Sequence, residues 1–569
     1  MTFRTLMTGA AAVAAAAVAA MSGPAAAQTA MTYKHATFQE QDAKIERLTS
    51  AVRMSRDEEA PARGFIGTAD MAVHPDNPRI IVGATMDLRS RICYLTVSKD
   101  AGRTWNHSKE LPGAGPYPYC QNTTAGTPVV SLEWGSNGTL YYARQAYGDG
   151  EGPREGKASI MLARTTDLGE TWQTTLVENN RGQSGESART ATGVSGLAVD
   201  TSGARDVVYV GYSRSHPDAP TGSPLRNPAV MLATSTDGGE TFGEPVNLNE
   251  RSQVNVTIAG QSVPLIMRTG FGAPFMTAHN GTLLVVAGPE FEQGKAPTAP
   301  ADSGSGGSPG SWFHFALPQL IARSTDQGKT FTISPMSPPR YDGTGATTGL
   351  KWTPKGGENG TFVAVHAATP PTSPTSGVAD VVVQRSTDDG VTWSEPLAID
   401  DAKPEEFVTS FYPQLNVAPN GRLDAVWQDN RGLADNRYHV RYTYSTDGGQ
   451  TWAPNVQVSD QPLNFNLGIS WNSDLRYPPG VASANQYAAF GWADARLADE
   501  VTQSQDNFGS VAQFSPLPTT ANTTAPKLAA AFAGLVLAGV VLLVAMQVRR
   551  RGGGPAPEPV TRRQATPAR

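Results

Sequence analysis

The chain has 569 residues, enough for several domains or for one large repeat architecture. Gly and Pro make up 101 residues and hydrophobic residues 39%, a composition rich in turns but not that of a disordered chain. Residues 28–526 carry a formal charge of about −13, because the C-terminal tail is rich in Arg. This negative charge argues against a general nucleic-acid-binding face, which would have to be basic. Two Cys residues exclude a disulfide-rich scaffold and a four-thiolate zinc site.

Both ends of the chain have the composition of targeting and membrane-anchoring segments. The first combines one Arg, an Ala-rich apolar run and a small-residue cleavage site, as secretory signal peptides do. Near the C-terminus, an uncharged run of 21 residues would span about 31 Å as a helix, and three Arg follow it on the predicted cytoplasmic side. We therefore predict an exported, single-pass protein with its body outside the cell. The predicted order is signal peptide 1–27, ectodomain 28–515, Pro/Thr stalk 516–527, transmembrane helix 528–548 and cytoplasmic tail 549–569.

Export would place both cysteines in an oxidising setting. A disulfide between Cys93 and Cys120 would close a loop of about 28 residues, which is feasible. The alternative is a buried free thiol at Cys93, within the apolar run RICYLTV. The disulfide is the favoured interpretation.

The body is built from repeats. The pattern S/T-x-D-x-G-x-T-W/F occurs six times, with its Asp residues 67, 70, 89, 62 and 59 positions apart. The longest interval contains an insertion of linker composition at 294–311. The repeated Asp residues are Asp100, Asp167, Asp237, Asp326, Asp388 and Asp447.

Each copy has the chemistry of a hairpin turn. The Asp side chain can accept hydrogen bonds from backbone N–H groups of the turn, and the Gly permits a positive φ. The closing Trp or Phe would fold back as an apolar plug between neighbouring sheets. A second interpretation makes the six Asp metal ligands, but their place in a repeated turn favours the structural role.

A second hairpin, often with an Asn-Gly turn such as Asn280-Gly281, precedes each box. Each unit therefore reads as four strands, which is the blade of a β-propeller. A seventh unit follows the last box and ends near 504–510 in a turn whose sequence only partly matches the Asp-box pattern. We predict an all-β fold of seven four-stranded blades, with a six-bladed ring as the alternative. The one stretch with a helical period is a short segment near 38–54.

The repeated boxes resemble those of the sialidase (neuraminidase) superfamily and of the wider set of BNR/Asp-box propeller proteins. The resemblance covers about residues 90–510. It implies that the boxes lie on outer turns, away from an axial site, and that the site acts as an exo-sialidase-like glycoside hydrolase. Sialidases typically have six blades, whereas seven units are counted here. The family's Arg-Ile-Pro motif is also missing from the first inner strand, which reads GFIGTADMAV.

In a propeller, the innermost strand of each blade lines the axis, and the residues just before it crowd one mouth. These positions hold many Arg and Tyr residues for an acidic domain. Arg can bind a carboxylate through two parallel hydrogen bonds. The residues are Arg63, Arg189, Arg268, Arg340, Tyr341, Tyr412, Arg476 and Tyr477.

The resemblance implies roles for them. A sialidase needs three Arg for the substrate carboxylate, a Tyr nucleophile activated by a Glu, and an Asp acid/base. The implied substrate-binding residues are Arg63, Arg268, Arg340 and Arg476. The implied catalytic residues are Tyr477, with Tyr412 second, as nucleophile, Glu290 as its base, and Asp70 or Asp87 as acid/base. Alternatively, these side chains pair with neighbouring carbonyls and carboxylates and hold the blades together.

A D-x-R motif recurs at the end of second strands in units one, six and seven. Its copies can line a ligand groove, or they can form ion pairs within a blade beneath a packed Trp, which is the favoured interpretation. The copies are Asp87-x-Arg89, Asp429-x-Arg431 and Asp494-x-Arg496.

Motifs for a metal or a cofactor are missing. The eight His residues form no H-E-x-x-H pair, and there is no phosphate-binding Gly loop or G-x-S-x-G elbow. We therefore expect no metal and no cofactor. Three functions remain open: a surface-anchored glycosidase that releases sialic acid or a similar acidic sugar, a non-catalytic propeller that binds a glycan or protein, and an envelope assembly scaffold. The expected partner is a sialoglycoconjugate or an envelope protein.

Overall fold

The structure is a computed structural model. It describes residues 33–55, 65–66, 70–87, 91–111, 117–120, 130–148, 158–180, 190–216, 228–251, 253–258, 261–268, 274–291, 318–336, 344–368, 379–403, 406, 408–433, 436–467, 478–498 and 505–515. All of them belong to the compact unit Met1–Ser515. The predicted signal peptide, stalk, transmembrane helix and tail lie outside the described residues and stay predictions. Within the described part of the chain, no helix is long and apolar enough to cross a membrane.

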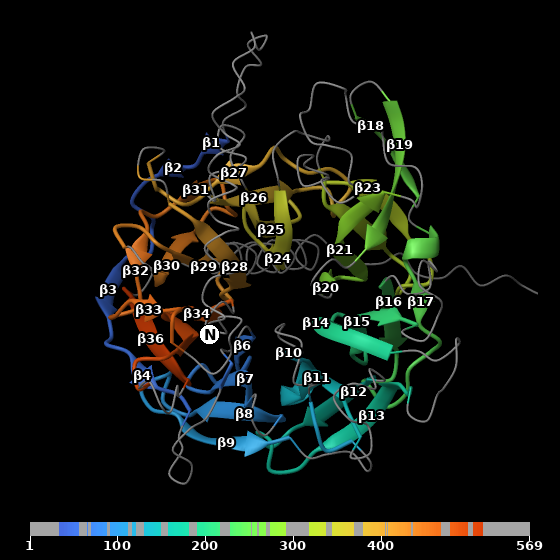
Figure 1. The fold of residues 1–569 in the computed structure, drawn as a ribbon, viewed down its shortest axis with the longest axis horizontal. Helices are drawn as coiled ribbons and strands as arrows, with labels where there is room; N and C mark the ends of the chain where they lie inside the picture. The colour runs from blue at the N-terminus through green and yellow to red at the C-terminus, as the bar shows by residue number, and fades with distance from the viewer. Residues whose placement is uncertain are drawn as a thin grey trace, which may run out of the picture. The chain divides into compact units, whose positions relative to one another are not determined.

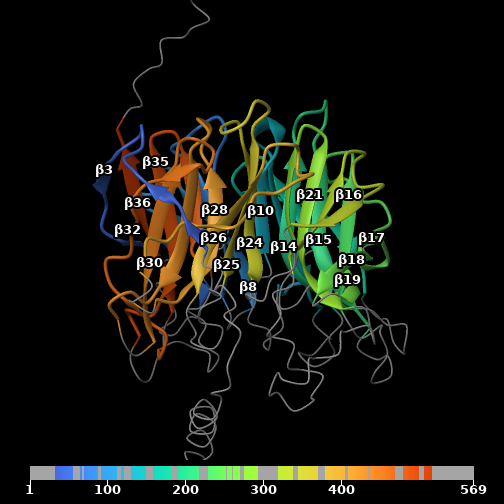
Figure 2. The same cartoon turned by 90° about the horizontal axis from the view of Figure 1, so that it is seen from above.

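Seven antiparallel sheets surround a common axis, which confirms the all-β, seven-bladed prediction and excludes six blades (Figure 1). The strands run roughly along that axis (Figure 2). Blade one contains β5 (Phe65–Ile66), β6 (Met71–Val73), β7 (Ile81–Asp87), β8 (Ile92–Ser98) and β9 (Asn106–Glu110). Blade two contains β10 (Val130–Trp134), β11 (Leu140–Ala146), β12 (Ser159–Thr165) and β13 (Gln173–Glu178). Blade three contains β14 (Thr190–Asp200), β15 (Val207–Ser215), β16 (Ala229–Ser235) and β17 (Val246–Asn247).

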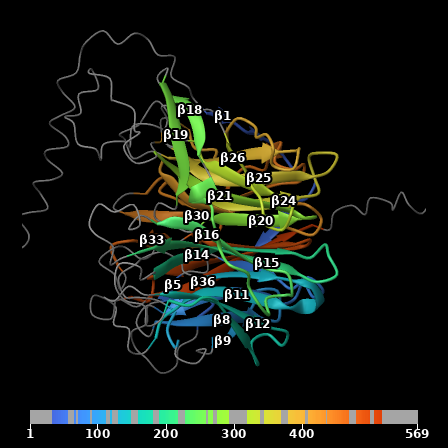
Figure 3. The same cartoon turned by 90° about the vertical axis from the view of Figure 1, so that its right-hand side faces the viewer.

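The remaining four sheets continue the ring in chain order. Blade four contains β18 (Val254–Ile258), β19 (Gln261–Arg268), β20 (Phe275–His279), β21 (Thr282–Phe291), β22 (Leu320–Ser324) and β23 (Thr332–Pro335). Its β18–β19 hairpin projects beyond the other sheets (Figure 3). Blade five contains β24 (Thr344–Thr353), β25 (Thr361–Ala368), β26 (Asp380–Ser386) and β27 (Leu397–Ala398). Blade six contains β28 (Ser410–Val417), β29 (Leu423–Asp429), β30 (Arg437–Ser445), β32 (Val456–Gln457) and β33 (Leu463–Asn464), with β31 (Thr451–Trp452) beside it.

Blade seven is completed by the N-terminal segment. The chain supplies β34 (Gly480–Ala484), β35 (Tyr487–Asp494) and β36 (Asp506–Phe514), and the outer strands are β3 (Ile45–Leu48) and β4 (Val52–Arg53). The turn expected near 504–510 is therefore wrong, because most of this stretch lies in β36. Since the fourth strand comes from the other end of the chain, blade seven needs no hairpin there and hence no Asp-box.

The N-terminal segment forms strands where a short helical stretch was expected. β1 (Lys34–His35) pairs with β27 of blade five, β2 (Thr37–Phe38) pairs with β31, and β3 pairs with β36. The helical expectation near 38–54 is wrong because these short runs find free outer edges of three blades. Edge pairing in a preformed sheet outweighs a weak local helical pattern.

Each Asp-box is a closed hydrogen-bonded turn. In the sixth box, Ser445 Oγ donates to Asp447 Oδ1 at 2.8 Å, and Thr451 donates its Oγ1–H to Oδ2 at 2.6 Å and its N–H to Oδ1 at 3.0 Å. The other five boxes repeat these bonds. The bonds hold the pKa of Asp447 below its usual range, although partial burial opposes them. Both carboxylate oxygens serve the turn, so the boxes act as fasteners.

The core lies between blades, where the box aromatics pack. Trp105 of the first box is buried with residues of blade seven, and Trp452 of the sixth box is buried against blade five. The Arg before the box in blades two, four and five also reaches the next box. Arg164 donates to Gly238 O at 2.8 Å, Arg323 to Asp389 O at 2.7 Å and Arg385 to Gly448 O at 2.8 Å.

Cys93 and Cys120 form a disulfide, with their Cα atoms 5.8 Å apart. Cys93 lies on β8, and both residues are fully buried. The neighbouring segment is also held by the buried Arg144, which donates to Tyr119 O at 2.9 Å and to Tyr117 O at 3.2 Å. The disulfide and the arginine thus fix the short stretch 117–120 against blades one and two.

Candidate axial site

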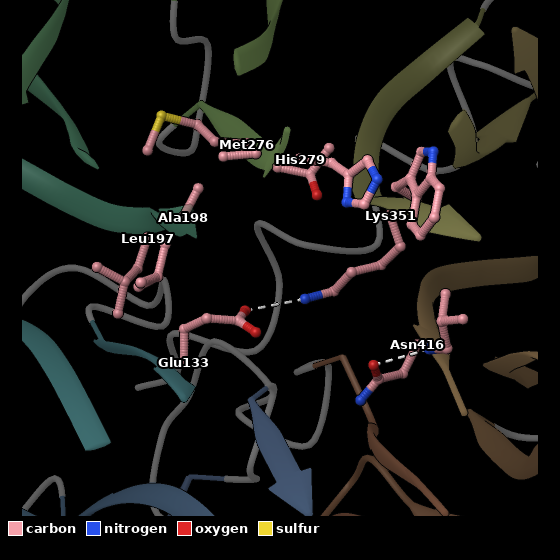
Figure 4. A pocket seen from close by; sticks show the side chains of 12 residues that line it. Glu133, Leu197, Ala198, Met276, His279, Lys351 and Asn416 are labelled. Atoms are coloured by element: carbon pink, nitrogen blue, oxygen red, sulfur yellow. Dashed lines mark hydrogen bonds and ion pairs between the residues drawn. The ribbon is translucent and has the colours of Figure 1, made fainter. Parts of the chain in front are cut away.

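A cavity of about 200 Å³ lies among the innermost strands of blades two to six (Figure 4). It sits at the C-terminal ends of these strands, just before their hairpin turns. Glu133 is the penultimate residue of β10, His279 is the last of β20, and Lys351 lies two residues before the end of β24. The cavity is therefore at the opposite end of the inner strands from the mouth expected from the sequence.

An ion pair crosses the channel at this level. Lys351 Nζ lies 3.1 Å from Glu133 Oε2, and these side chains are 31% and 33% exposed. Blades two and five are not neighbours in the ring, and Figure 4 shows Lys351 reaching over toward Glu133. Burial by itself would lower the pKa of Lys351, but Glu133 and Asp70 outweigh it and raise that pKa.

Asp70 is the one predicted catalytic residue whose described contacts place it in this group. It directly precedes β6, and its Oδ2 accepts a hydrogen bond from the N–H of Leu132 at 3.2 Å. Burial raises the pKa of Asp70 to about 6, helped by the negative charge of Glu133 and opposed by Ser131 and Lys351. A carboxyl group with such a pKa can hold or release a proton near neutral pH.

The wall of the cavity combines aromatic, apolar and amide groups. His279 stacks on Trp352 with ring centroids 3.3 Å apart and an interplanar angle of 14°. Burial lowers the pKa of His279, so its imidazole is neutral at pH 7. Asn416 Nδ2 donates to Val481 O at 2.8 Å and ties blade six to blade seven. Sequence reasoning missed these residues; the available signal was a polar side chain inside an inner strand, such as Lys351 in GLKWT.

The other predicted catalytic residues that the structure describes lie on separate blades. Asp87 ends β7 of blade one, Glu290 lies on β21 of blade four, and Tyr412 lies on β28 of blade six. Blade five stands between Glu290 and Tyr412. The backbone of Tyr412 has a φ of 52° at a bulge of β28, a strained conformation for a bulky residue.

Most of the predicted mouth is outside the described residues. The structure gives the backbone of Arg268 at the end of β19 but not its side chain. The residues that lie outside are Arg63, Arg189, Arg340, Tyr341, Arg476 and Tyr477.

One tyrosine does contact a glutamate in the described residues, but at neither of the predicted nucleophile positions. Tyr212 donates its hydroxyl hydrogen to Glu178, and Arg214 donates to the same carboxylate at 2.6 Å. Tyr212 is fully buried, and burial together with Glu178 raises its pKa well above its ordinary value. A neutral Tyr locked between blades two and three is a structural clamp, not an accessible nucleophile.

The D-x-R motifs form ion pairs. Arg496 Nη2 lies 2.6 Å from Asp494 Oδ2, which also accepts a hydrogen bond from the buried Trp492 indole at 3.1 Å. Arg431 lies 3.4 Å from Asp429 within blade six and 2.5 Å from Asp401 of the neighbouring blade. Arg89 of the first copy lies outside the described residues. In the part of the chain that is described, no group of three or more His, Cys, Asp or Glu could hold a metal ion.

A comparison with protein-family models agrees with the repeat. A family model described as "BNR/Asp-box repeat" matches residues 443–454, the sixth box. No curated protein matches the chain. Similar solved structures include the Hadza microbial sialidase Hz136, with 13% identity, a TM-score of 0.40, and coverage of 86% of this chain and 99% of that one.

Two further solved structures are similar to this chain. A protein of unknown function from Dyadobacter fermentans has 14% identity and a TM-score of 0.40, covering 68% of this chain and 94% of its own. The GH93 alpha-L-arabinofuranosidase of Fusarium graminearum has 14% identity and a TM-score of 0.37, covering 70% and 92%. Similarities this low carry no argument about substrate. The boxes, their hydrogen bonds and the seven sheets identify the chain as a seven-bladed β-propeller with Asp-boxes, of which residues 443–454 match the BNR/Asp-box repeat.

Proposed function

We propose that this propeller is a surface-anchored glycoside hydrolase that removes a terminal acidic sugar, sialic acid or a similar one, from a glycoconjugate. The observation that carries the proposal is Asp70, a carboxyl group on the channel side of blade one with a pKa of about 6. Such a group can protonate the leaving oxygen of a glycosidic bond. The family resemblance of the boxes supports the same reaction class.

The remaining roles would fall to the mouth at which the inner strands begin. Asp70, which lies between β5 and β6 in the middle of the inner edge of blade one, would face the sugar from inside the channel. Arg63, Arg268, Arg340 and Arg476 would bind the sugar carboxylate. Tyr477, or Tyr412 in second place, would attack the anomeric carbon while Asp70 gives its proton to the departing oxygen. Water would then release the sugar from the tyrosine as Asp70 takes a proton back. Glu290 would take the hydroxyl proton of the attacking tyrosine, and Asp87 is the alternative to Asp70 as acid/base.

The test is turnover of an aryl α-sialoside by the full-length protein, beside Asp70→Asn, Tyr477→Phe and Tyr412→Phe. We expect Asp70→Asn to lose far more activity on a natural sialoside than on the aryl substrate, because an aryl leaving group needs little protonation. Equal losses on both substrates would remove Asp70 from the role of acid. No turnover by a folded wild-type protein on sialosides or other acidic glycosides would favour a binding propeller or an envelope scaffold instead.

A further inference from the structure

We propose that the cavity at the hairpin-turn end of the channel is a second binding site, specific for a small neutral polyhydroxylated ligand the size of one sugar ring. It is distinct from the mouth, because it is formed where the inner strands end. Its existence does not depend on whether the mouth is catalytic.

Three polar groups at the cavity keep unused hydrogen-bonding capacity. Among the described residues, Lys351 Nζ has one acceptor, Glu133 Oε2, although an ammonium carries three N–H donors. Glu133 Oε1 has no partner within that same set, and neither does either ring nitrogen of His279. These groups offer donors and acceptors together, which is what a set of hydroxyl groups requires, since each hydroxyl both donates and accepts.

The charge of the site selects against anions. Glu133 and Lys351 neutralise each other, and Asp70 adds a negative charge above its pKa of about 6. A carboxylate ligand would bring a second uncompensated negative charge into a half-buried channel, which is costly. A neutral ligand needs no compensation, and it can use the free N–H and oxygen sites without breaking the 3.1 Å ion pair.

Size and shape favour a single ring. The cavity of about 200 Å³ has room for roughly seven waters at their liquid volume of about 30 Å³ each. Leu197, Met276 and Val417, from blades three, four and six, also line the cavity, so apolar side chains stand among the polar groups. A pyranose or furanose ring presents C–H groups on one face and hydroxyl groups at its edge, so it matches both kinds of lining.

The test is isothermal titration calorimetry with the full-length protein in buffer free of sugars and glycerol. The probes are arabinose, galactose and glucose, with galacturonate and galactosamine as charged analogues of one skeleton. We expect at least one neutral sugar to bind, and to bind at least tenfold more tightly than galacturonate. Glu133→Gln and Lys351→Met should each weaken binding about tenfold. Lys355→Met, an exposed lysine on the same hairpin, should leave it unchanged.

Three results would overturn the proposal: no neutral sugar binds, galacturonate binds more tightly, or both pocket variants bind normally. Tyr412→Phe and Tyr477→Phe separate this site from the mouth, since they should leave calorimetric binding intact even where they abolish turnover. Loss of binding in those variants would place the sugar at the mouth and contradict the proposal. Circular dichroism and the thermal midpoint of each variant show that a lost signal is not lost folding.

Discussion

Two ion pairs of the propeller look alike in composition but differ in how fully their groups are used. Arg422 donates to Asp424 Oδ1 at 2.8 Å and Oδ2 at 3.0 Å, and also to three backbone carbonyls of blade seven. The Asp424 carboxylate also accepts from Tyr442 at 2.5 Å, and both members of the pair are almost fully buried. Lys351 and Glu133 share one hydrogen bond and face a cavity. Saturation marks the first pair as a fastener, and unused capacity marks the second as a site.

The largest effect should come from breaking the saturated pair. Arg422→Met leaves Asp424 buried without its cation and frees three carbonyls at the junction of blades six and seven. We expect a loss of about 3–5 kcal/mol in the free energy of unfolding. Urea denaturation measures it. The double variant Arg422→Met with Asp424→Leu should recover part of the loss, whereas equal losses would show that the carbonyl contacts dominate.

The titration of Asp70 should make the stability of the protein depend on pH. Its folded pKa of about 6 lies above the usual value of 3.8, so the folded protein binds more protons than the unfolded chain between pH 4 and 6. Stability therefore falls as pH rises through that window. Asp70→Asn should remove about 1–2 kcal/mol of this decline, since Asp70 is only partly buried. Thermal midpoints at pH 4, 5, 6 and 7 test it; an unchanged slope would contradict the raised pKa.

The next largest effect on stability is expected from the hydrogen bonds that join neighbouring blades. Arg385→Met removes a hydrogen bond of 2.8 Å to Gly448 O in the next box, at a cost of about 1–1.5 kcal/mol. Arg103→Met is the matched control, because this exposed Arg lies inside a box and does not precede one. If both variants unfold at the same denaturant concentration, the bond between neighbouring blades contributes nothing.

The smallest effect on stability is expected at the unsaturated pair. Lys351→Met should change the free energy of unfolding by less than about 1 kcal/mol, because a partly exposed ion pair with one hydrogen bond contributes little. The same variant should weaken sugar binding about tenfold. A loss of stability as large as that of Arg422→Met would make Lys351 another fastener and would break the contrast.

Much of the fold could be predicted because its signals are local. A box contains its own Asp, Gly and Thr within eight residues, and an Asn-Gly turn such as Asn280-Gly281 sits between the strands that it joins, with φ of 47° and 78°. The closure of blade seven could not be predicted in this way. β3 and β36 lie more than 450 residues apart, and neither strand carries a mark of its partner.

The candidate site likewise contains one residue that could be predicted from the sequence and others that could not. Asp70 could be proposed because the family resemblance implies an Asp acid/base and Asp70 lies in the predicted first inner strand, GFIGTADMAV. Glu133 and Lys351 come from blades two and five and carry no shared motif. Their pairing depends on the ring closing with both side chains at one level of the channel.

The amino-acid sequence by itself determined the repeated four-stranded units, the turns that punctuate them and the aromatic plugs between them, because hydrogen bonds and hydrophobic periodicity within short segments specify these features. Only the tertiary structure decided which charged groups meet on the axis, which of them are saturated, and which edges the N-terminal strands cover. Those outcomes depend on distances between residues remote in the chain, and these distances exist only after the ring has closed.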